Sequence, residues 1–249
     1  MEKEAVIVVD YQNSFANPET GSLYVKGGEK IAPVINEVVA GVKNKGGIII
    51  SSRELHPIGH ISFASSFVGK ESITEAFKNG ISPSEINFIT KKEVAEWTEK
   101  NNGIAKNASF SVKELKAYLD TVGDQALWPE HCVKGSEGAE FFKEFDSTKV
   151  DIEVKKGFKP DTHPYSAFEA KTIDEKESTF EVLKRLGVKI VKVVGLATDY
   201  CDIATVLDAR KYGMQTEFIE KASAGVDPAG TIEALKRMRE AGAKIIDGK

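Results

Sequence analysis

Short apolar runs alternate with longer helix-like stretches along most of this chain, and this alternation constrains its fold more than any other feature. Each run is short enough for a buried strand, and the stretches between the runs repeat apolar residues at helical spacing. Strands that alternate with helices usually pair in parallel. The sequence therefore predicts an α/β fold with a doubly wound, mostly parallel sheet flanked by helices. The predicted strands are residues 5–10, 47–52, 151–155, 189–194, 216–219 and 244–246, and the predicted helices are residues 29–45, 178–186, 199–211 and 229–241.

Residues 65–125 break this alternation. They are polar, rich in lysine and helix-prone, with short apolar pieces at residues 86–89 and 115–119. A buried parallel strand needs a nearly continuous apolar run. We therefore expect an inserted cap or small subdomain in a single domain that spans residues 1–249. The alternative is an ordinary pair of strand–helix units that belong to the main sheet.

The composition excludes several classes of function. Apolar residues make up 41% of the chain, charged residues 29%, and the net charge is -4, so no broad basic surface for nucleic acid is expected. No apolar run approaches the ~20 residues of a membrane-spanning helix, and the first ten residues do not resemble a signal peptide. The two cysteines do not suggest a disulfide framework. We expect a cytoplasmic protein without a membrane or nucleic-acid partner.

The first predicted strand ends in a carboxylate, in the segment VVDYQNSF. Asp10 would lie at the carboxyl end of this strand, which is the edge where parallel α/β sheets bind ligands. An aspartate after a strand is also common as a cap of the following turn. Position alone leaves both roles open for Asp10.

Cys201 lies in the segment VVGLATDYCDIAT, where a strand turns directly into a helix. The first turn of a helix offers unpaired N–H groups and a partial positive charge, both of which lower the pKa of a thiol. The same N–H groups can bind an oxyanion. We interpret Cys201 as a nucleophile, with a buried structural thiol as the alternative. Cys132, in LWPEHCVKG, lacks this setting and is interpreted as structural.

A carboxylate and imidazoles follow the second predicted strand. Glu54, His56 and His60 occur in RELHPIGH, and His131 occurs later in WPEHC. Alternate residues of an extended backbone point the same way, so Glu54 and His56 can act together. Such ligands suit zinc, iron or manganese. The alternative is a polar loop with solvated histidines, and the sequence contains no nucleotide-binding glycine loop.

Lys156 follows the third predicted strand, in the segment VKKGFKP. A cation near a thiol stabilises the thiolate. Exposure to solvent is nevertheless the more common outcome for a lysine in a Lys-Lys-Gly stretch.

Five segments, taken in order, resemble the isochorismatase-like cysteine hydrolases. They are VVDYQNSF, SSRELHPIGHISFA, LWPEHCVKG, KKG followed by YSAF, and VGLATDYC. The resemblance runs from about residue 5 to about residue 225 and is interrupted by the inserted segment. Within the family, RELHPIGH and WPEHC are similar to the nicotinamidases (pyrazinamidases) rather than to the isochorismatases, carbamoyl-sarcosine amidases or biuret-type members.

This resemblance implies a metal-dependent amidohydrolase that converts nicotinamide to nicotinic acid and ammonia in NAD salvage, through a thioester, and that also deaminates pyrazinamide. It implies a cis peptide bond between Leu196 and Ala197. The implied site residues are Asp10, Lys156 and Cys201 as a catalytic triad, the N–H groups of Ala197 and Cys201 as an oxyanion hole, and Phe15, Trp128 and Tyr165 around the substrate ring.

The resemblance also implies one divalent metal ion, zinc before iron or manganese, that binds the ring nitrogen of nicotinamide. Its ligands would be Glu54, His56, His131 and His60. The family normally has Asp at the position of Glu54, and His60 is a ligand in only some members. We expect Glu54 to bind the metal directly, with binding through water as the alternative.

Two other functions stay open. One is hydrolysis of another small amide or carbamoyl compound by the same fold, and the other is metal or ligand binding without catalysis. A homo-oligomer is compatible with the sequence.

Overall fold

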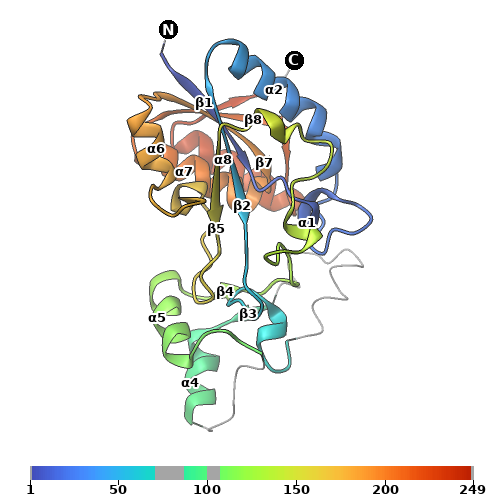
Figure 1. The fold of residues 1–249 in the computed structure, drawn as a ribbon. Helices are drawn as coiled ribbons and strands as arrows, with labels where there is room; N and C mark the ends of the chain where they lie inside the picture. The colour runs from blue at the N-terminus through green and yellow to red at the C-terminus, as the bar shows by residue number, and fades with distance from the viewer. Residues whose placement is uncertain (1, 71–86, 100–106, 248–249) are drawn as a thin grey trace.

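Seven strands form one sheet at the centre of the computed structural model, which describes residues 2–70, 87–99 and 107–247 (Figure 1). The strand order is β6-β5-β2-β1-β7-β8-β9, and every neighbouring pair is parallel except β5 and β6. The predicted mostly parallel sheet flanked by helices is therefore confirmed. The strands are β1 (Glu4–Val9), β2 (Ile48–Glu54), β5 (Ile152–Lys156), β6 (Lys171–Thr172), β7 (Ile190–Leu196), β8 (Gln215–Ala224) and β9 (Lys244–Ile246).

Helices cover both faces of this sheet. Val6 and Val8 of β1 pack in one core with α2 (Ala32–Asn44). Ala5, Ile7 and Val9 point the other way, into a second core. Because β1 is buried on both faces, its sequence is a continuous apolar run rather than an alternating one. The helices of the second core are α6 (Thr179–Arg185), α7 (Ile203–Lys211) and α8 (Pro228–Glu240).

Side-chain caps fix where several helices begin. The Ser178 side chain accepts a hydrogen bond from the Glu181 N–H, and Glu181 accepts one in return from the Ser178 N–H, which forms a capping box at α6. Asp227 caps α8 by accepting from the Gly230 N–H, and Pro228 occupies the first helical position. These caps explain why the predicted starts of both helices lie within a residue or so of the observed ones.

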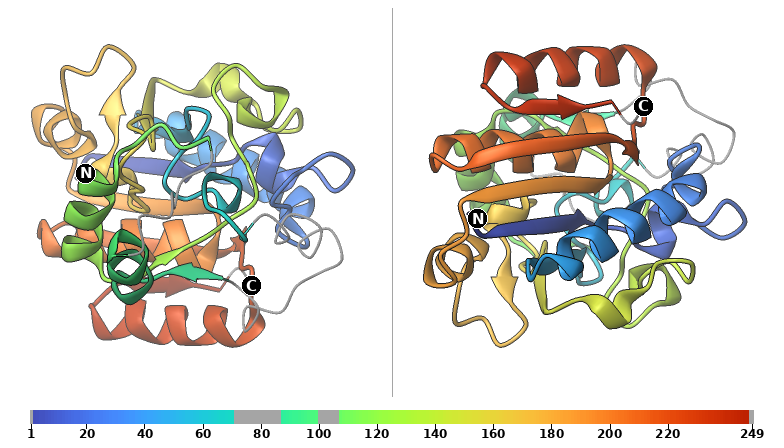
Figure 2. Two further views of the ribbon diagram at one scale, coloured as in Figure 1. Left: turned by 90° about the horizontal axis from the view of Figure 1, so that it is seen from below. Right: turned by 90° about the horizontal axis from the view of Figure 1, so that it is seen from above.

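The segment between β2 and β5 includes a small subdomain beneath the carboxyl ends of these strands (Figure 1). The left view of Figure 2 shows it in front of the sheet when the molecule is seen from that edge. Its elements are β3 (Phe88–Ile89), α4 (Lys91–Glu99), α5 (Val112–Val122) and β4 (Gln125–Ala126). β3 and β4 pair with each other in a separate antiparallel sheet.

This subdomain has an apolar core of its own, which includes Phe67, Ile89, Val94, Leu115 and Leu119. A capping box between Ser111 and Glu114 starts α5. Residues 71–86 and 100–106 lie outside the described part of the chain. The cap boundaries at about 65–125, and the single domain over 1–249, therefore stay predictions.

The observed elements differ from the predicted ones in places. The helix expected over residues 199–211 begins with a π-helical turn, Thr198–Asp202, and α7 starts only at Ile203. The two-residue edge strand β6 was not predicted, because Lys171 and Thr172 carry no apolar signal. None of the described helices is both long and apolar enough to cross a membrane.

Helix α8 provides a matched test of the second core. Leu235 is 8% exposed and packs in that core, whereas Ile232 on the same helix is 70% exposed. We expect Leu235→Ala to lower the free energy of unfolding by about 2 kcal/mol or more, because it leaves a cavity. Ile232→Ala should change it by less than about 0.5 kcal/mol. Urea denaturation of the two variants measures both values, and equal losses would contradict this packing.

Candidate active site

Four neighbouring strands bring polar side chains together at the carboxyl edge of the sheet. Glu54 and Lys156 are the last residues of β2 and β5 and are partners in the register of these strands. Asp10 directly follows β1, and Cys201 lies in the turn after β7. Since β5, β2, β1 and β7 are adjacent, the four side chains converge at the edge where α/β sheets bind ligands.

Lys156 is at the centre of this group and is fully buried. Its Nζ lies 3.0 Å from Asp10 Oδ2, 2.7 Å from Glu54 Oε1 and 3.4 Å from Cys201 Sγ. It also donates a hydrogen bond to the Pro164 carbonyl, at 3.1 Å. Lys156 is therefore not exposed to solvent, although exposure is the more common outcome for a lysine in such a sequence. The residues of the implied triad are in contact with one another.

The charges in this group shift one another's pKa values. Burial alone would lower the pKa of Lys156, but Asp10, Cys201 and Glu54 together raise it well above its ordinary value. Lys156 therefore stays charged. Burial would raise the pKa of Glu54, but Lys156 and His56 hold it well below the ordinary value, so Glu54 stays ionised.

Cys201 differs from the prediction in one respect. Burial raises the pKa of its thiol well above the ordinary value, and the attraction of Lys156 does not outweigh this effect. The expected lowering of the thiol pKa is therefore wrong for the resting protein. A thiolate must form by transfer of the proton to a neighbouring base rather than by ionisation into solvent.

Asp10 is the base within reach. Its backbone is left-handed, with φ 45°, and its N–H donates to Ser52 Oγ at 3.2 Å. Ser52 in turn donates to Asp10 Oδ1 at 2.8 Å, while Oδ2 faces Lys156. Burial raises the pKa of Asp10 although Lys156 opposes the shift. Its side chain faces the buried site, which favours the ligand-edge interpretation over a turn cap.

The turn that carries Cys201 has an unusual backbone. The peptide bond between Leu196 and Ala197 is cis, which confirms that prediction. The Ala197 carbonyl then accepts hydrogen bonds from the N–H groups of Tyr200 and Asp202, at 3.0 and 3.1 Å. Ala197 and Cys201 both line the adjacent pocket. Their role as an oxyanion hole stays a prediction.

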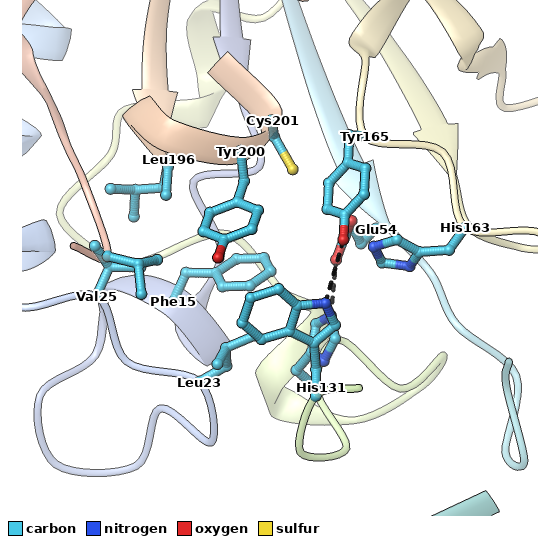
Figure 3. Close-up of a pocket in the computed structure, with 13 residues that line it drawn as sticks. Phe15, Leu23, Val25, Glu54, His131, His163, Tyr165, Leu196, Tyr200 and Cys201 are labelled. Carbon is cyan, nitrogen blue, oxygen red and sulfur yellow. Dashed lines mark hydrogen bonds and ion pairs between the residues drawn. The ribbon is translucent and has the colours of Figure 1, made fainter. Parts of the chain in front are cut away.

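Aromatic side chains surround this pocket. Figure 3 shows the rings of Tyr200 and Tyr165 on opposite sides of the space into which the Cys201 sulfur points. The Trp128 ring meets that of Tyr200 edge-on, with ring centres 5.0 Å apart. Trp128 Nε1 donates to the Tyr165 hydroxyl at 3.4 Å. Phe15, Trp128 and Tyr165, which the resemblance implies around the substrate ring, all line the pocket. Asp10 and Lys156 lie behind this lining, next to Cys201.

All four histidines of the chain gather at one end of this site. They are buried, and their ring centres lie 4.1 to 6.4 Å from one another where they pair. Ligand atoms of Glu54, His56 and His131 lie within 4.8 Å of one another, as do those of His56, His60 and His163. Sequence reasoning named three of these histidines and missed His163.

The hydrogen bonds of His56 and His131 fix their proton positions. Nδ1 of His56 lies 2.9 Å from the Gly157 carbonyl, and Nδ1 of His131 lies 2.7 Å from the Pro129 carbonyl. A carbonyl only accepts, so each Nδ1 must be the donor. Burial lowers the pKa of His56, although Glu54 opposes the shift, so this ring is neutral. A neutral ring with the proton on Nδ1 presents a lone pair on Nε2.

The Nε2 atoms of His56 and His131 face the same carboxylate oxygen. Glu54 Oε2 lies 3.1 Å from His56 Nε2 and 3.0 Å from His131 Nε2. The lone pair of His56 Nε2 and the carboxylate oxygen repel each other unless a proton or a metal ion lies among these three atoms. Ligands of one ion with metal–ligand distances of about 2.0–2.2 Å are about 2.9–3.4 Å apart. The donor set therefore fits a divalent metal, and direct binding by Glu54 stays a prediction.

His60 is bonded differently. Its Nε2 lies 2.9 Å from the Thr162 carbonyl and so carries a proton, while its Nδ1 accepts from the Ser62 N–H at 3.2 Å. Ser62 Oγ lies 2.8 Å from the same Nδ1. Both nitrogens are therefore engaged, and a role of His60 as a ligand stays a prediction.

Two supporting residues were not anticipated. Gln12 accepts from the Glu54 N–H at 2.8 Å and donates to the Glu54 carbonyl at 2.9 Å, so it holds the backbone of Glu54 on both sides. Gly157 has φ 64°, and a Cβ there would lie 2.3 Å from His56 Cε1. Only glycine permits this approach of His56. Both positions lie inside segments already singled out, but a hydrogen bond to backbone leaves no sequence pattern.

Cys132 lies apart from this chemistry. Burial raises the pKa of its thiol well above the ordinary value, and its Sγ contacts the Gly138 carbonyl at 3.8 Å. The backbone of Cys132, rather than its thiol, supports the site, because its carbonyl accepts from the His56 N–H at 3.0 Å.

Comparison with known proteins finds a matching family and similar sequences. The isochorismatase domain family matches residues 4–249. The chain is 29% identical to the nicotinamidase of Acinetobacter baylyi, over 98% of this chain and 92% of that protein. It is 28% identical to the nicotinamidase of Escherichia coli, over 98% of this chain and 95% of that protein.

A solved structure is similar as well. The pyrazinamidase of Pyrococcus horikoshii, in complex with zinc, has a TM-score of 0.65 and 29% identity, covering 98% of this chain and 99% of that one. The resemblance to nicotinamidases and pyrazinamidases is thereby confirmed. Since the family match spans nearly the whole chain, the protein belongs to the isochorismatase domain family.

Proposed function

We propose that this protein is a nicotinamidase, which hydrolyses nicotinamide to nicotinic acid and ammonia through a thioester on Cys201 and also deaminates pyrazinamide. One observation carries the proposal. The Cys201 sulfur faces an aromatic-walled pocket while a buried cation, Lys156 Nζ, lies 3.4 Å from it and 3.0 Å from Asp10 Oδ2. Similarity to several nicotinamidases supports the choice of substrate.

The first half of the reaction forms the thioester. Asp10 takes the thiol proton of Cys201 as the sulfur attacks the amide carbon. The carbonyl oxygen gains negative charge, which the N–H groups of Ala197 and Cys201 would stabilise. Protonated Asp10 then donates its proton to the amide nitrogen, the C–N bond breaks, and ammonia leaves.

The second half releases the acid. Ionised Asp10 takes a proton from water, and the resulting hydroxide attacks the thioester carbon. The C–S bond breaks, Asp10 returns its proton to the Cys201 sulfur, and nicotinic acid leaves. The raised pKa of Asp10 suits a group that must hold the proton between these steps.

Glu54, His56 and His131 would hold one divalent metal, for which we propose zinc, with iron or manganese as alternatives. When bound, the ion supplies an electron-pair acceptor for the pyridine nitrogen of the substrate and thereby orients its amide. The zinc complex of the Pyrococcus horikoshii pyrazinamidase supports this choice. A reaction that depends on a free thiol suits the cytoplasm, where its product would serve NAD salvage.

The walls of the pocket favour a flat aromatic amide over a carbamoyl compound. Phe15, Trp128, Tyr165 and Tyr200 present ring faces and edges, and only a few polar groups reach the space between them. Aromatic rings attract one another by about 0.5–1.5 kcal/mol beyond the burial of area. A small aliphatic amide would gain little of this energy.

Ammonia release tests the function and the nucleophile together. We expect the purified protein to release ammonia from nicotinamide, and faster than from small aliphatic amides or carbamoyl compounds. Cys201→Ala should lower this rate at least about 10³-fold, because it removes the sulfur that forms the thioester. Cys132→Ala should retain most of the activity, since the backbone of Cys132 rather than its thiol supports the site.

Loss of activity in both cysteine variants alike would contradict the assignment of Cys201. Preference for a carbamoyl compound would favour the related amidohydrolase, and no ammonia from any amide would favour binding without catalysis.

A double variant tests whether Asp10 and Lys156 act as a unit. Asp10→Asn and Lys156→Ala should each lower kcat by about 10²–10⁴-fold, because each removes part of the proton transfer to and from Cys201. The double variant should be little slower than the slower single variant. Rates that multiply independently would count against the triad.

Lys155→Ala is the matched control. The Lys155 side chain is 16% exposed and pairs with Glu175 at 2.7 Å, away from the site. Its loss should leave kcat unchanged. Circular dichroism of each variant shows whether the loss of a buried charge has unfolded the protein.

A further inference from the structure

We propose that His163 is a ligand of the divalent metal, so that Glu54 and three imidazoles, those of His56, His131 and His163, hold the ion. The inference rests on the metal-binding part of the proposed function and deepens it. It assigns the third imidazole to a residue that sequence reasoning missed, in place of His60.

His163 is a buried imidazole without a full set of partners. It is 5% exposed, and within the described residues its Nδ1 has no hydrogen-bond partner. It lines the pocket together with Glu54 and His131, and Figure 3 shows its ring turned toward the Glu54 carboxylate. A buried polar atom left without a partner destabilises the folded protein. An ion beside this ring would remove that destabilisation.

The ring positions fit one shared ion. The ring centre of His163 lies 5.4 Å from that of His56 and 6.4 Å from that of His131, and the centres of His56 and His131 are 4.9 Å apart. Imidazoles bound to one ion at about 2.1 Å have ring centres about 4.5–6.4 Å apart. All three separations fall in this range, with His131 and His163 on opposite sides of the ion.

The ligand atoms point to the same place. Nitrogens of His56, His60 and His163 form one group within 4.8 Å, and His56 also belongs to the group with Glu54 and His131. His56 is the residue that the two groups share, so an ion bound by His56 would have donors of both groups nearby. A rotation of the His163 side chain toward such an ion would break no hydrogen bond at Nδ1.

His60 would have to give up bonds that His163 does not have. Its Nε2 is bonded to the Thr162 carbonyl and its Nδ1 to Ser62. Ligation by His60 would forfeit the stabilisation that one of these hydrogen bonds provides. The backbone of His163, by contrast, is held in position, since Tyr118 of α5 donates to its carbonyl at 3.2 Å.

Such a ligand set constrains the ion. One carboxylate and three imidazoles would occupy four positions, and the 6.4 Å between the ring centres of His131 and His163 is wider than the ~5.3 Å of a tetrahedral site. A position for the substrate nitrogen then exists only on an ion with five or six ligands. The set therefore favours an expanded zinc site, iron or manganese.

Cobalt binding tests the assignment without reference to activity. The protein is stripped of metal and titrated with Co²⁺, and its affinity and visible absorption spectrum are compared among wild type, His163→Gln and His60→Gln. We expect His163→Gln to lower the affinity at least about 10-fold and to change the spectrum. His60→Gln should keep the wild-type spectrum. A wild-type affinity and spectrum in His163→Gln would overturn the proposal.

X-ray absorption of the cobalt-loaded wild type and His60→Gln does not depend on the folding of the His163 variant. Scattering from three imidazoles in both the wild type and His60→Gln supports the proposal. Scattering from only two imidazoles in the wild type overturns it. His56→Ala distinguishes failure of the metal site itself from failure of the role of His163. If it also binds Co²⁺ like wild type, the metal site of the proposed function is wrong. If His56→Ala loses the ion while His163→Gln binds it unchanged, only the role of His163 fails.

Discussion

The ammonium group of Lys156 is the charge on which the rest of this site depends. It is fully buried between two buried carboxylates, Asp10 and Glu54, and beside the Cys201 sulfur. Two carboxylates this close to each other in the interior would not both ionise without a cation between them. Loss of one partner of a buried ion pair typically costs about 3–5 kcal/mol. The strand order brings Lys156 into contact with Asp10 and Glu54, because β5, β2 and β1 are adjacent and end at the same edge of the sheet.

Glu54 connects the triad to the histidines. One carboxylate oxygen faces Lys156, and the other lies between the Nε2 atoms of His56 and His131. Glutamate is longer than aspartate by one C–C bond, about 1.5 Å. This length suits a side chain that reaches the histidines while it keeps its contact with Lys156. Gln12 holds the Glu54 backbone at both its N–H and its carbonyl, so the position of the carboxylate is well determined.

Much of this architecture could be predicted from the sequence, and the failures have physical causes. Apolar runs marked the six main strands, and five motifs led to Asp10, Cys201 and the histidine loop. Residue-level reasoning favoured exposure for Lys156, although Val154 and Lys156 share a face of β5 and both are buried. The sign of the Cys201 pKa shift was wrong because the burial of the thiol cannot be read from one turn. His163 lies in an irregular loop without periodicity, and the small number of histidines was the available clue.

The proposed mechanism depends on attack of the Cys201 sulfur on the carbonyl carbon of the substrate. An aldehyde analogue of the substrate tests this attack most directly. Nicotinaldehyde labelled with carbon-13 at the aldehyde is added to the metal-loaded protein, and its carbon resonance is followed by NMR. We predict a resonance of a tetrahedral, sulfur-bound carbon in wild type and in Cys132→Ala, and none in Cys201→Ala. The same bound resonance in Cys201→Ala, or its absence from wild type at saturating nicotinaldehyde, would contradict the account.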